Sequence, residues 1–329
     1  MSSPAARVLD IARSFQPACV LAAAADLDVF NVLASRPMNA EEVASAIRGD
    51  VRATTILLDA LVALELLSKQ GDTYALPAEL VDVLTDKSPQ TVLPMVLHQA
   101  NCLRRWVQLP QVVRSGRPAE RIPSIRGEAA DTASFIGAMH AISGPVADTV
   151  VGRLGPLSFQ CLLDVGGASG TWTMAFLRRV PSARAIIFDL PDVIPMARQR
   201  LTDAGFIDRV DLVAGNFETD PLPTGADFVW LSAIAHQNSR EQNRALFGKI
   251  RDALAPGGTL AIRDIVMDED HVHPPGGALF AVNMLVGTER GGTFSLEEYK
   301  ADLEAAGFGN VELVYRDAWM DSLIRATRK

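Results

Sequence analysis

The sequence predicts an α/β protein in two parts, a mainly helical N-terminal region followed by a doubly wound, mainly parallel sheet. From residue 161 onward, short apolar runs alternate with helical patterns, which is typical of a parallel sheet covered by helices. Residues 1–110 instead repeat apolar side chains at helical spacing and hold one hairpin pattern. We therefore expect domains at 1–115 and 151–329, joined by 116–150 as a linker and pocket helix.

The C-terminal half contains five apolar runs that we expect to be strands, near 161–165, 185–189, 210–214, 226–232 and 258–263. Helices are expected near 171–180, 192–204, 240–254 and 295–306. Pro256-Gly257-Gly258 is expected to break the chain before the fifth strand. Two further runs, 311–315 and 323–326, have no helix between them, which predicts an antiparallel last strand.

The N-terminal region reads as helix, helix and hairpin, which is a winged-helix arrangement. Asn39 fits an N-cap, a stronger helix spans 52–67, and 66–76 looks like a hairpin with a Gly-Asp turn. Winged helices often bind DNA, but the second helix here presents only Arg52 and also carries the acids Asp59 and Glu65. The first helix is apolar over much of its circumference, which suits a subunit interface. We expect dimerisation and no nucleic-acid partner.

Composition narrows the class of protein. The 329 residues are 48% hydrophobic and 21% charged, which supports a large core and argues against disorder. The formal net charge of −8 gives no electrostatic case for nucleic acid. Cys19, Cys102 and Cys161 are scattered and are expected to be buried small hydrophobes. No signal peptide pattern opens the chain, and the apolar run 17–25 is shorter than the ~18 residues of a membrane span, so we expect a cytoplasmic protein without a membrane partner.

The most informative stretch runs from Asp164 to Gly170, where a strand pattern, a glycine turn and a helix pattern follow one another. Gly166, Gly167 and Gly170 allow the backbone to approach a ligand closely. Asp189 ends the next strand, 189 − 164 = 25 residues on, close to the spacing of about 20 at which such folds place a ribose-binding acid. The pattern predicts an adenosine-containing cofactor and by itself leaves NAD open.

Five blocks in order extend this signal. They are Asp164–Gly170, Phe188-Asp189-Leu190-Pro191, Gly215-Asn216-Phe217, the segment around His236, and Pro256–Asp264. With them, nearly all of the chain resembles the plant-type, caffeic-acid-type small-molecule O-methyltransferases and their bacterial natural-product branch, which are class I S-adenosylmethionine-dependent methyltransferases. The resemblance implies a Rossmann-like seven-stranded sheet with an antiparallel last strand and an N-terminal winged-helix dimerisation domain. It also implies S-adenosyl-L-methionine (SAM) as methyl donor and S-adenosyl-L-homocysteine as product.

The resemblance assigns a set of cofactor-binding residues. Asp164 matches the acid near the methionine amine, Asp189 the ribose-binding acid, and Phe217 the residue that packs on adenine. Asn216 stands where the family usually has Asp, and its amide carbonyl can still accept a hydrogen bond. Ala168 replaces a family glycine. The full set is Asp164, Gly166, Gly167, Gly170, Asp189, Leu190, Asn216, Phe217 and Ser232.

His236 matches the catalytic histidine of the family and follows the fourth strand, at an edge where such sheets bind ligands. Histidine suits a general base because its reference pKa of about 6.5 is near working pH. Asp264 matches the acid that flanks the histidine and would fix its tautomer. The sequence differs from the family pattern at two nearby points. The usual His-Asp-Trp reads His236-Gln237-Asn238, and no acid aligns at Gly291-Gly292, with Glu289 as a weak substitute.

Four residues are candidates for contact with the methyl acceptor, two of them through the resemblance. Met139 and Met284 match pocket positions, Asn283 is a polar residue in an apolar run, and Trp106 is a further wall candidate. His271 and His273 lie among loop acids, but their spacing is loose and we expect a solvated loop without a metal site.

Together these observations predict SAM-dependent methylation of a hydroxyl on a small, aromatic or polyketide-like molecule, with His236 as base. Three other functions stay open: C- or N-methylation on the same scaffold, a non-catalytic ligand-binding or regulatory homologue, and a ligand-responsive DNA-binding protein.

Overall fold

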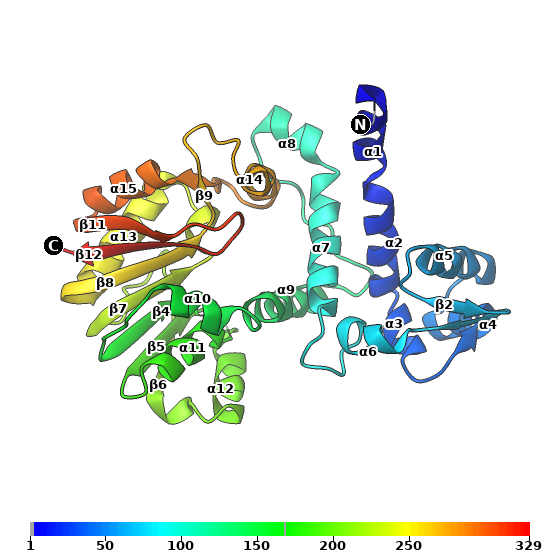
Figure 1. Ribbon diagram of the computed structural model, residues 1–329, viewed down its shortest axis with the longest axis horizontal. Coiled ribbons are helices and arrows are strands. Elements are labelled where there is room, and N and C mark those ends of the chain that lie inside the picture. The colour runs from blue at the N-terminus through cyan, green and yellow to red at the C-terminus, as the bar shows by residue number, and fades with distance from the viewer. Residues whose placement is uncertain (1–2, 168) are drawn as a thin grey trace. The chain divides into compact units, whose positions relative to one another are not determined.

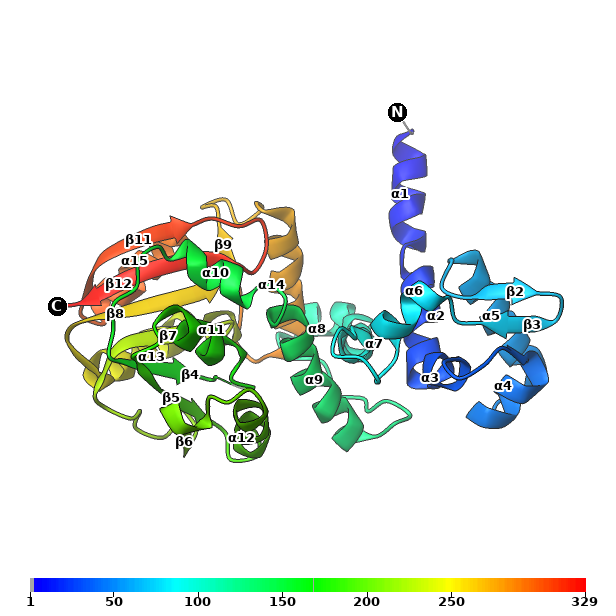
Figure 2. The same cartoon turned by 60° about the horizontal axis from the view of Figure 1, so that its bottom comes forward.

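The computed structural model describes residues 3–167 and 169–329, which form two compact units (Figure 1, Figure 2). Unit 1 comprises residues 3–107 and 120–142, and unit 2 comprises 108–119 and 143–329. The segment 116–150, which we expected to be a linker, is therefore divided between the two units. Ala168 lies outside the described residues.

Unit 2 is built on a seven-stranded sheet of order β11-β12-β8-β7-β4-β5-β6. Five strands run parallel: β4 (Cys161–Val165), β5 (Arg184–Asp189), β6 (Val210–Ala214), β7 (Ala226–Ser232) and β8 (Leu254–Asp264). β12 (Ser322–Arg328) is antiparallel to both β8 and β11 (Phe308–Tyr315), which confirms the predicted reversed last strand. The chain order reverses between β4 and β7, and open α/β sheets bind ligands at the strand ends of such a switch point.

Helices cover both faces of this sheet (Figure 1). Residues of α13 (Arg240–Ala253) and α15 (Leu296–Ala305) join the core on one face. Residues of α10 (Ala147–Arg153), α11 (Thr171–Arg179) and α12 (Ile194–Asp203) join the core on the other. Because both faces are covered, β4 and β7 are almost wholly buried, which is why their sequences read as continuous apolar runs.

One detail of the expected sheet was wrong. Pro256-Gly257-Gly258 does not break the chain before the fifth strand but lies inside β8. Leu254 pairs with Ala226 and Thr259 pairs with Phe228, so residues 255–258 form a bulge opposite Asp227. The Asp227 carboxylate accepts hydrogen bonds from the backbone N–H groups of residues 160 and 161, which fixes the start of β4 there.

The remaining elements of unit 2 are short or lie near the strand ends. They are α8 (Leu109–Ser115), α14 (Pro275–Gly287), β9 (Val266–Met267), β10 (Phe294–Ser295) and the 3-10 turns η1 (Ile207–Arg209) and η2 (Ala235–Gln237). β9 and β10 pair in parallel as a small separate sheet.

Unit 1 is mainly helical. Its elements are α1 (Pro4–Arg13), α2 (Phe15–Asp26), α3 (Val29–Leu33), α4 (Ala40–Ile47), α5 (Val51–Ala63), α6 (Ala78–Leu84), α7 (Leu93–Trp106), most of α9 (Glu128–Ser143), β1 (Met38–Asn39), β2 (Ser68–Gln70) and β3 (Thr73–Ala75). The predicted hairpin is confirmed as β2 and β3, with the Gly-Asp pair in its turn. Asn39 caps α4 in a reciprocal capping box with Glu42, as expected.

The first helix carries an apolar surface. α1 has no buried residue, and Val8, Leu9, Ile11 and Phe15 are all at least half exposed in the single chain. Among the described residues, the helical stretch Pro4–Asp26 is long and apolar enough to cross a membrane, judged by length and composition alone. This stretch includes the shorter apolar run 17–25 noted in the sequence. Its last turn is buried in the core of unit 1 through Ala24 and Ala25. Of the cysteines, Cys102 is buried, whereas Cys19 and Cys161 are only partly buried.

Candidate active site

The glycine turn after β4 lies close to β5 and to the side chains of Ile234 and Asp164. Gly166 has φ +68°, and its N–H donates to the carbonyl of Phe188 at 2.8 Å. A Cβ at Gly166 would lie 2.9 Å from Ile234, and one at Gly167 would lie 2.9 Å from the carboxyl carbon of Asp164. Any larger residue at these two positions would therefore displace the surrounding side chains. Gly170 follows at the N-cap of α11.

Asp164 is a fully buried carboxyl group at the end of β4. Its Oδ2 accepts a hydrogen bond from the Thr173 hydroxyl at 2.6 Å. Burial raises the pKa of Asp164 from 3.8 to about 7, the Thr173 hydrogen bond opposes that rise, and the charge of Asp189 adds to it. A cation bound beside this carboxyl group would favour its ionised form, so the site is suited to a ligand that carries an amine.

The ends of β5 and β6 form the second edge of the site. Asp189 Oδ1 accepts the backbone N–H of Leu190 at 2.7 Å, and the Asp189 carbonyl accepts the N–H of Gly215 at 2.9 Å. Asn216 Oδ1 accepts the N–H of residue 218 at 2.9 Å, which uses one of its lone pairs inside the turn. The Phe217 ring packs against the core near the glycine turn, and Leu190 is exposed.

His236 lies in the 3-10 turn after β7, next to the end of β8. Its Nδ1 is 2.8 Å from Asp264 Oδ1, and its backbone N–H donates to Asp264 Oδ2 at 3.2 Å. His236 is 6% exposed and Asp264 is 1% exposed. Because a carboxylate can only accept, this contact assigns the ring proton to Nδ1 and leaves the lone pair on Nε2. Such an imidazole can remove a proton through Nε2.

The turn that carries His236 is held by buried amides. Asn243 Nδ2 donates to the carbonyl of Ala235 at 2.9 Å, and Asn238 Nδ2 donates to Asn243 Oδ1 at 3.1 Å. Both asparagines are at most 5% exposed. Gln237, the other departure from the family pattern, is exposed and donates to the carbonyl of residue 233 at 3.0 Å. Asn238 therefore supports the turn from within the core.

The Gly291-Gly292 pair also contacts this turn. The Gly292 N–H donates to the His236 carbonyl at 2.9 Å, and a Cβ at Gly291 would lie 2.6 Å from that same oxygen. Glu289, the weak substitute for the second flanking acid, is exposed. At this position the chain supplies backbone contact to the His236 turn.

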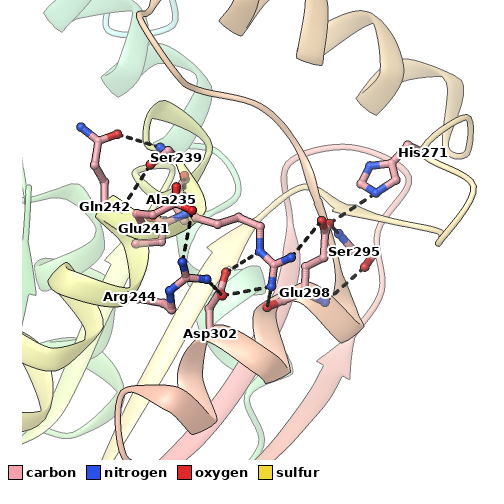
Figure 3. Close-up of polar contacts among 11 residues, drawn as sticks. Ala235, Ser239, Glu241, Gln242, Arg244, His271, Ser295, Glu298 and Asp302 are labelled. Atoms are coloured by element: carbon pink, nitrogen blue, oxygen red, sulfur yellow. Dashed lines mark hydrogen bonds and ion pairs between the residues drawn. The ribbon is translucent and has the colours of Figure 1, made fainter.

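An ionic network joins α13, which follows the turn, to α15 (Figure 3). Asp302 is 4% exposed and binds Arg240 at 2.9 Å and Arg244 at 2.9 Å. Glu298 lies 3.5 Å from Arg240 and 3.4 Å from His271. The network fixes the first turn of α13, where Asn243 lies.

The loop histidines do not gather ligands for a metal ion. His271 and His273 are exposed, and His273 Nδ1 is 2.8 Å from Asp270 Oδ2. Within residues 3–167 and 169–329, no group of three or more His, Cys, Asp or Glu side chains is arranged to hold a metal.

Sequence reasoning missed two aromatic residues, Phe280, which contacts His236, and Trp319, which contacts Phe280. The Phe280 ring on α14 meets the His236 ring edge-on, with 4.9 Å between centroids, and Trp319 meets Phe280 at 5.8 Å. Asn283 and Met284 lie one helical turn beyond Phe280 on α14. Trp106 and Met139 belong to unit 1, at the end of α7 and in α9, and both are partly buried.

Ser232, at the end of β7, is held by a buried arginine that sequence reasoning also missed. Its hydroxyl accepts a hydrogen bond from Arg263 Nη1 at 3.2 Å. Arg263 is 5% exposed, pairs with Asp321 at 2.6 Å and lies over the Trp172 ring at 4.6 Å. The Ser232 hydroxyl is thus oriented by Arg263 at the end of β7.

The sheet with one reversed strand, the glycine turn and the buried acid at the switch point together define a SAM-dependent methyltransferase. Family models agree: residues 115–309 match the O-methyltransferase domain, and residues 9–84 match the O-methyltransferase dimerisation domain. The chain belongs to the O-methyltransferase family.

Individual relatives span nearly the whole chain. The tetracenomycin polyketide synthesis 8-O-methyl transferase of Streptomyces glaucescens is 31% identical over 92% of this chain and 91% of its own. The N,N-dimethyltransferase of Streptomyces rimosus is 29% identical over 92% and 90%. The crystal structure of human N-acetylserotonin methyltransferase in complex with SAM matches with a TM-score of 0.84 and 27% identity, over 99% of this chain and 98% of that one.

Proposed function

We propose that this enzyme transfers a methyl group from SAM to a hydroxyl of a small, aromatic or polyketide-like molecule, with His236 as the general base. The observation that carries this proposal is the 2.8 Å contact between His236 Nδ1 and Asp264, which leaves Nε2 able to accept a proton. The polyketide O-methyltransferase relative supports the class of acceptor.

The residues at the switch point fit SAM. Asp164, with its raised pKa, would bind the methionine amine, and Asp189 would bind the ribose hydroxyls. Ile234 and Asp164 pack where Cβ atoms at Gly166 and Gly167 would lie, so only glycine allows this tight turn, through which the backbone would approach the ligand. Phe217 would pack on the adenine ring and Asn216 would accept from its amino group, while Gly170, Leu190 and Ser232 would complete the site.

For this reaction the protein must orient the acceptor hydroxyl toward the methyl group and remove the hydroxyl proton. SAM supplies an electrophilic methyl group on a sulfonium. His236 Nε2 would take the proton of the acceptor hydroxyl as its oxygen receives the methyl group that bound SAM would supply, with S-adenosyl-L-homocysteine as the leaving product. Asp264 keeps the ring oriented and stabilises the imidazolium. Correct alignment accounts for up to roughly 7–11 kcal/mol of such barriers, and a positioned base adds ~10²–10⁴-fold.

The acceptor would lie against α14. Phe280, Asn283 and Met284 share the side of that helix whose Phe280 meets His236. Trp106 and Met139 are proposed as further acceptor residues from the sequence alone. We further propose that the enzyme works as a cytoplasmic homodimer, since residues 9–84 match the family dimerisation domain and α1 exposes an apolar face.

A second candidate, N-methylation of an amine, is favoured by the N,N-dimethyltransferase relative. C-methylation and a non-catalytic role are the other outcomes to separate. The test is incubation with isotope-labelled SAM and matched phenol, aniline and carbon-nucleophile acceptors, followed by mass spectrometry and NMR of the products. Labelled methyl on phenol oxygen supports the proposal. Label only on nitrogen or carbon, or SAM binding without turnover of any acceptor, would refute it.

A further inference from the structure

We propose that Lys249 is a positioning residue for the cofactor, because it fixes the loop 216–220 that presents Asn216 and Phe217. This inference rests on the proposed function, in which that loop binds the adenine. Lys249 itself lies on α13 and is not one of the residues proposed to touch SAM.

The ammonium group of Lys249 uses all of its donors on one loop. Its Nζ lies 2.9, 2.7 and 3.1 Å from the backbone carbonyl oxygens of residues 217, 218 and 220. A lysine ammonium has three N–H donors, and three carbonyls converge on it here. No carboxylate lies within ion-pair distance of Lys249 among the described residues. The Lys249 side chain therefore stabilises the backbone conformation of this loop.

Among the described residues, the other hydrogen bonds of loop 216–220 lie within the loop itself. The Asn216 N–H donates to Asp220 Oδ2 at 2.8 Å, and the Asp220 N–H returns to the Asn216 carbonyl at 2.7 Å. These bonds join residues within the turn, whereas the Lys249 hydrogen bonds connect the turn to α13. Hydrogen bonds that involve a charged donor are stronger than neutral ones.

The same helix anchors the proposed base. Asn243, on α13, donates to the Ala235 carbonyl beside His236, and Lys249 lies six residues further along the helix. α13 therefore holds the proposed adenine loop through Lys249 and the His236 turn through Asn243. A change at Lys249 should act on cofactor affinity and leave the His236–Asp264 contact in place.

The experiment compares Lys249→Met with wild type by calorimetric titration of SAM and by steady-state kinetics. Methionine keeps most of the aliphatic stem, so packing on α13 is preserved. We expect the Kd and KM for SAM to rise about tenfold, which corresponds to ~1.4 kcal/mol, while kcat at saturating SAM stays within about twofold. Amides of residues 216–220 should exchange with deuterium faster in the variant. Lys249→Arg, which keeps a cationic donor, should recover most of the affinity.

The matched control is Lys300→Met on α15, where Lys300 only pairs with Glu297 at 2.8 Å on the surface. It should leave the Kd for SAM unchanged. An unchanged Kd in Lys249→Met, or an equal loss in Lys300→Met, would overturn the inference while leaving the proposed function intact. A normal Kd with a large fall in kcat would also overturn it. If the wild-type protein does not bind SAM, both the proposed SAM site and this inference are refuted.

Discussion

Asp264 binds His236 twice, accepting from the ring Nδ1 at 2.8 Å and from the backbone N–H at 3.2 Å. Both residues are buried, and Asp264 Oδ1 also accepts the N–H of Ile265 at 2.8 Å, so the carboxylate is itself fixed. The double contact sets the orientation of the ring as well as its tautomer.

Replacing Asp264 with Asn should therefore lower kcat by roughly 10²-fold or more with little change in Kd for SAM. An amide can donate to Nδ1, which would move the ring proton to Nε2 and remove the proton-accepting lone pair. Steady-state kinetics together with SAM titration checks this. Full kcat in Asp264→Asn would show that the tautomer is not set by this contact.

Asn243→Ala should destabilise the protein and slow catalysis together. The change removes the side-chain donor to the Ala235 carbonyl, which keeps the backbone N–H of Asn238 as its other partner. It also removes the Asn243 oxygen that accepts from the buried Asn238 amide, and an unsatisfied buried amide costs about 1–3 kcal/mol of unfolding free energy. Urea unfolding gives the stability and kcat reports the His236 turn. Gln237→Ala, at an exposed neighbour, is the control and should cost under about 1 kcal/mol. Equal stability losses in the two variants would contradict the role assigned to Asn243.

Gly291→Ala should impair catalysis although glycine-to-alanine is a small change. The added Cβ would lie 2.6 Å from the His236 carbonyl oxygen, so the turn must shift. We expect kcat to fall about tenfold or more, with SAM affinity unchanged, because the atoms that the added Cβ would meet belong to Thr288, His236 and Gln237 and not to the residues proposed to bind SAM. Gly292→Ala is the paired control, since no atom lies within 4 Å of its added Cβ. Similar kcat values for the two variants would argue against this contact.

Asp164 should couple SAM binding to pH. Its pKa of about 7 in the folded, unliganded enzyme lies above the unfolded value of 3.8, so the folded state binds more protons between these values. Its contribution to stability is therefore greatest at low pH and is lost as the pH rises through about 7. A cationic methionine amine favours the ionised carboxylate, so binding should release a proton and SAM affinity should increase from pH 6 to pH 8.

Calorimetric titration of SAM in buffers of different ionisation enthalpy measures the number of protons released on binding. We expect a net release near pH 6.5 in wild type and none from this group in Asp164→Asn, which should also bind SAM more weakly. The same proton release in both proteins would assign it to another group.

Local patterns in the sequence were sufficient for most of the fold. The seven strands and the reversed β12 follow from apolar runs and from the missing helix between the last two, and both predictions are confirmed. The bulge at Pro256–Gly258 was not foreseen, because Pro and Gly favour a break and only the pairing of Leu254 with Ala226 keeps that segment in the sheet.

The sequence predicted only those site residues that belong to a recognisable motif. His236 and Asp264 were paired by their matches to family positions, and the structure brings their side chains within hydrogen-bonding distance. Phe280 and Trp319 were missed, since the contacts of Phe280 with His236 and with Trp319 join segments far apart in the chain. Asn238 is a departure from the family motif, and its hydrogen bond to Asn243 gives it a structural role that no local pattern indicates.

The central claim, that His236 removes the proton of a hydroxyl acceptor, is tested most directly with His236→Gln and two phenols of similar shape but different acidity. With a phenol that is neutral at the assay pH, we expect kcat to fall ~10²–10⁴-fold. With a phenol that is already ionised, the loss should shrink to less than about tenfold, because no proton remains to be removed. An equally large loss with both phenols, or no loss with either, would contradict the assignment of His236 as the base.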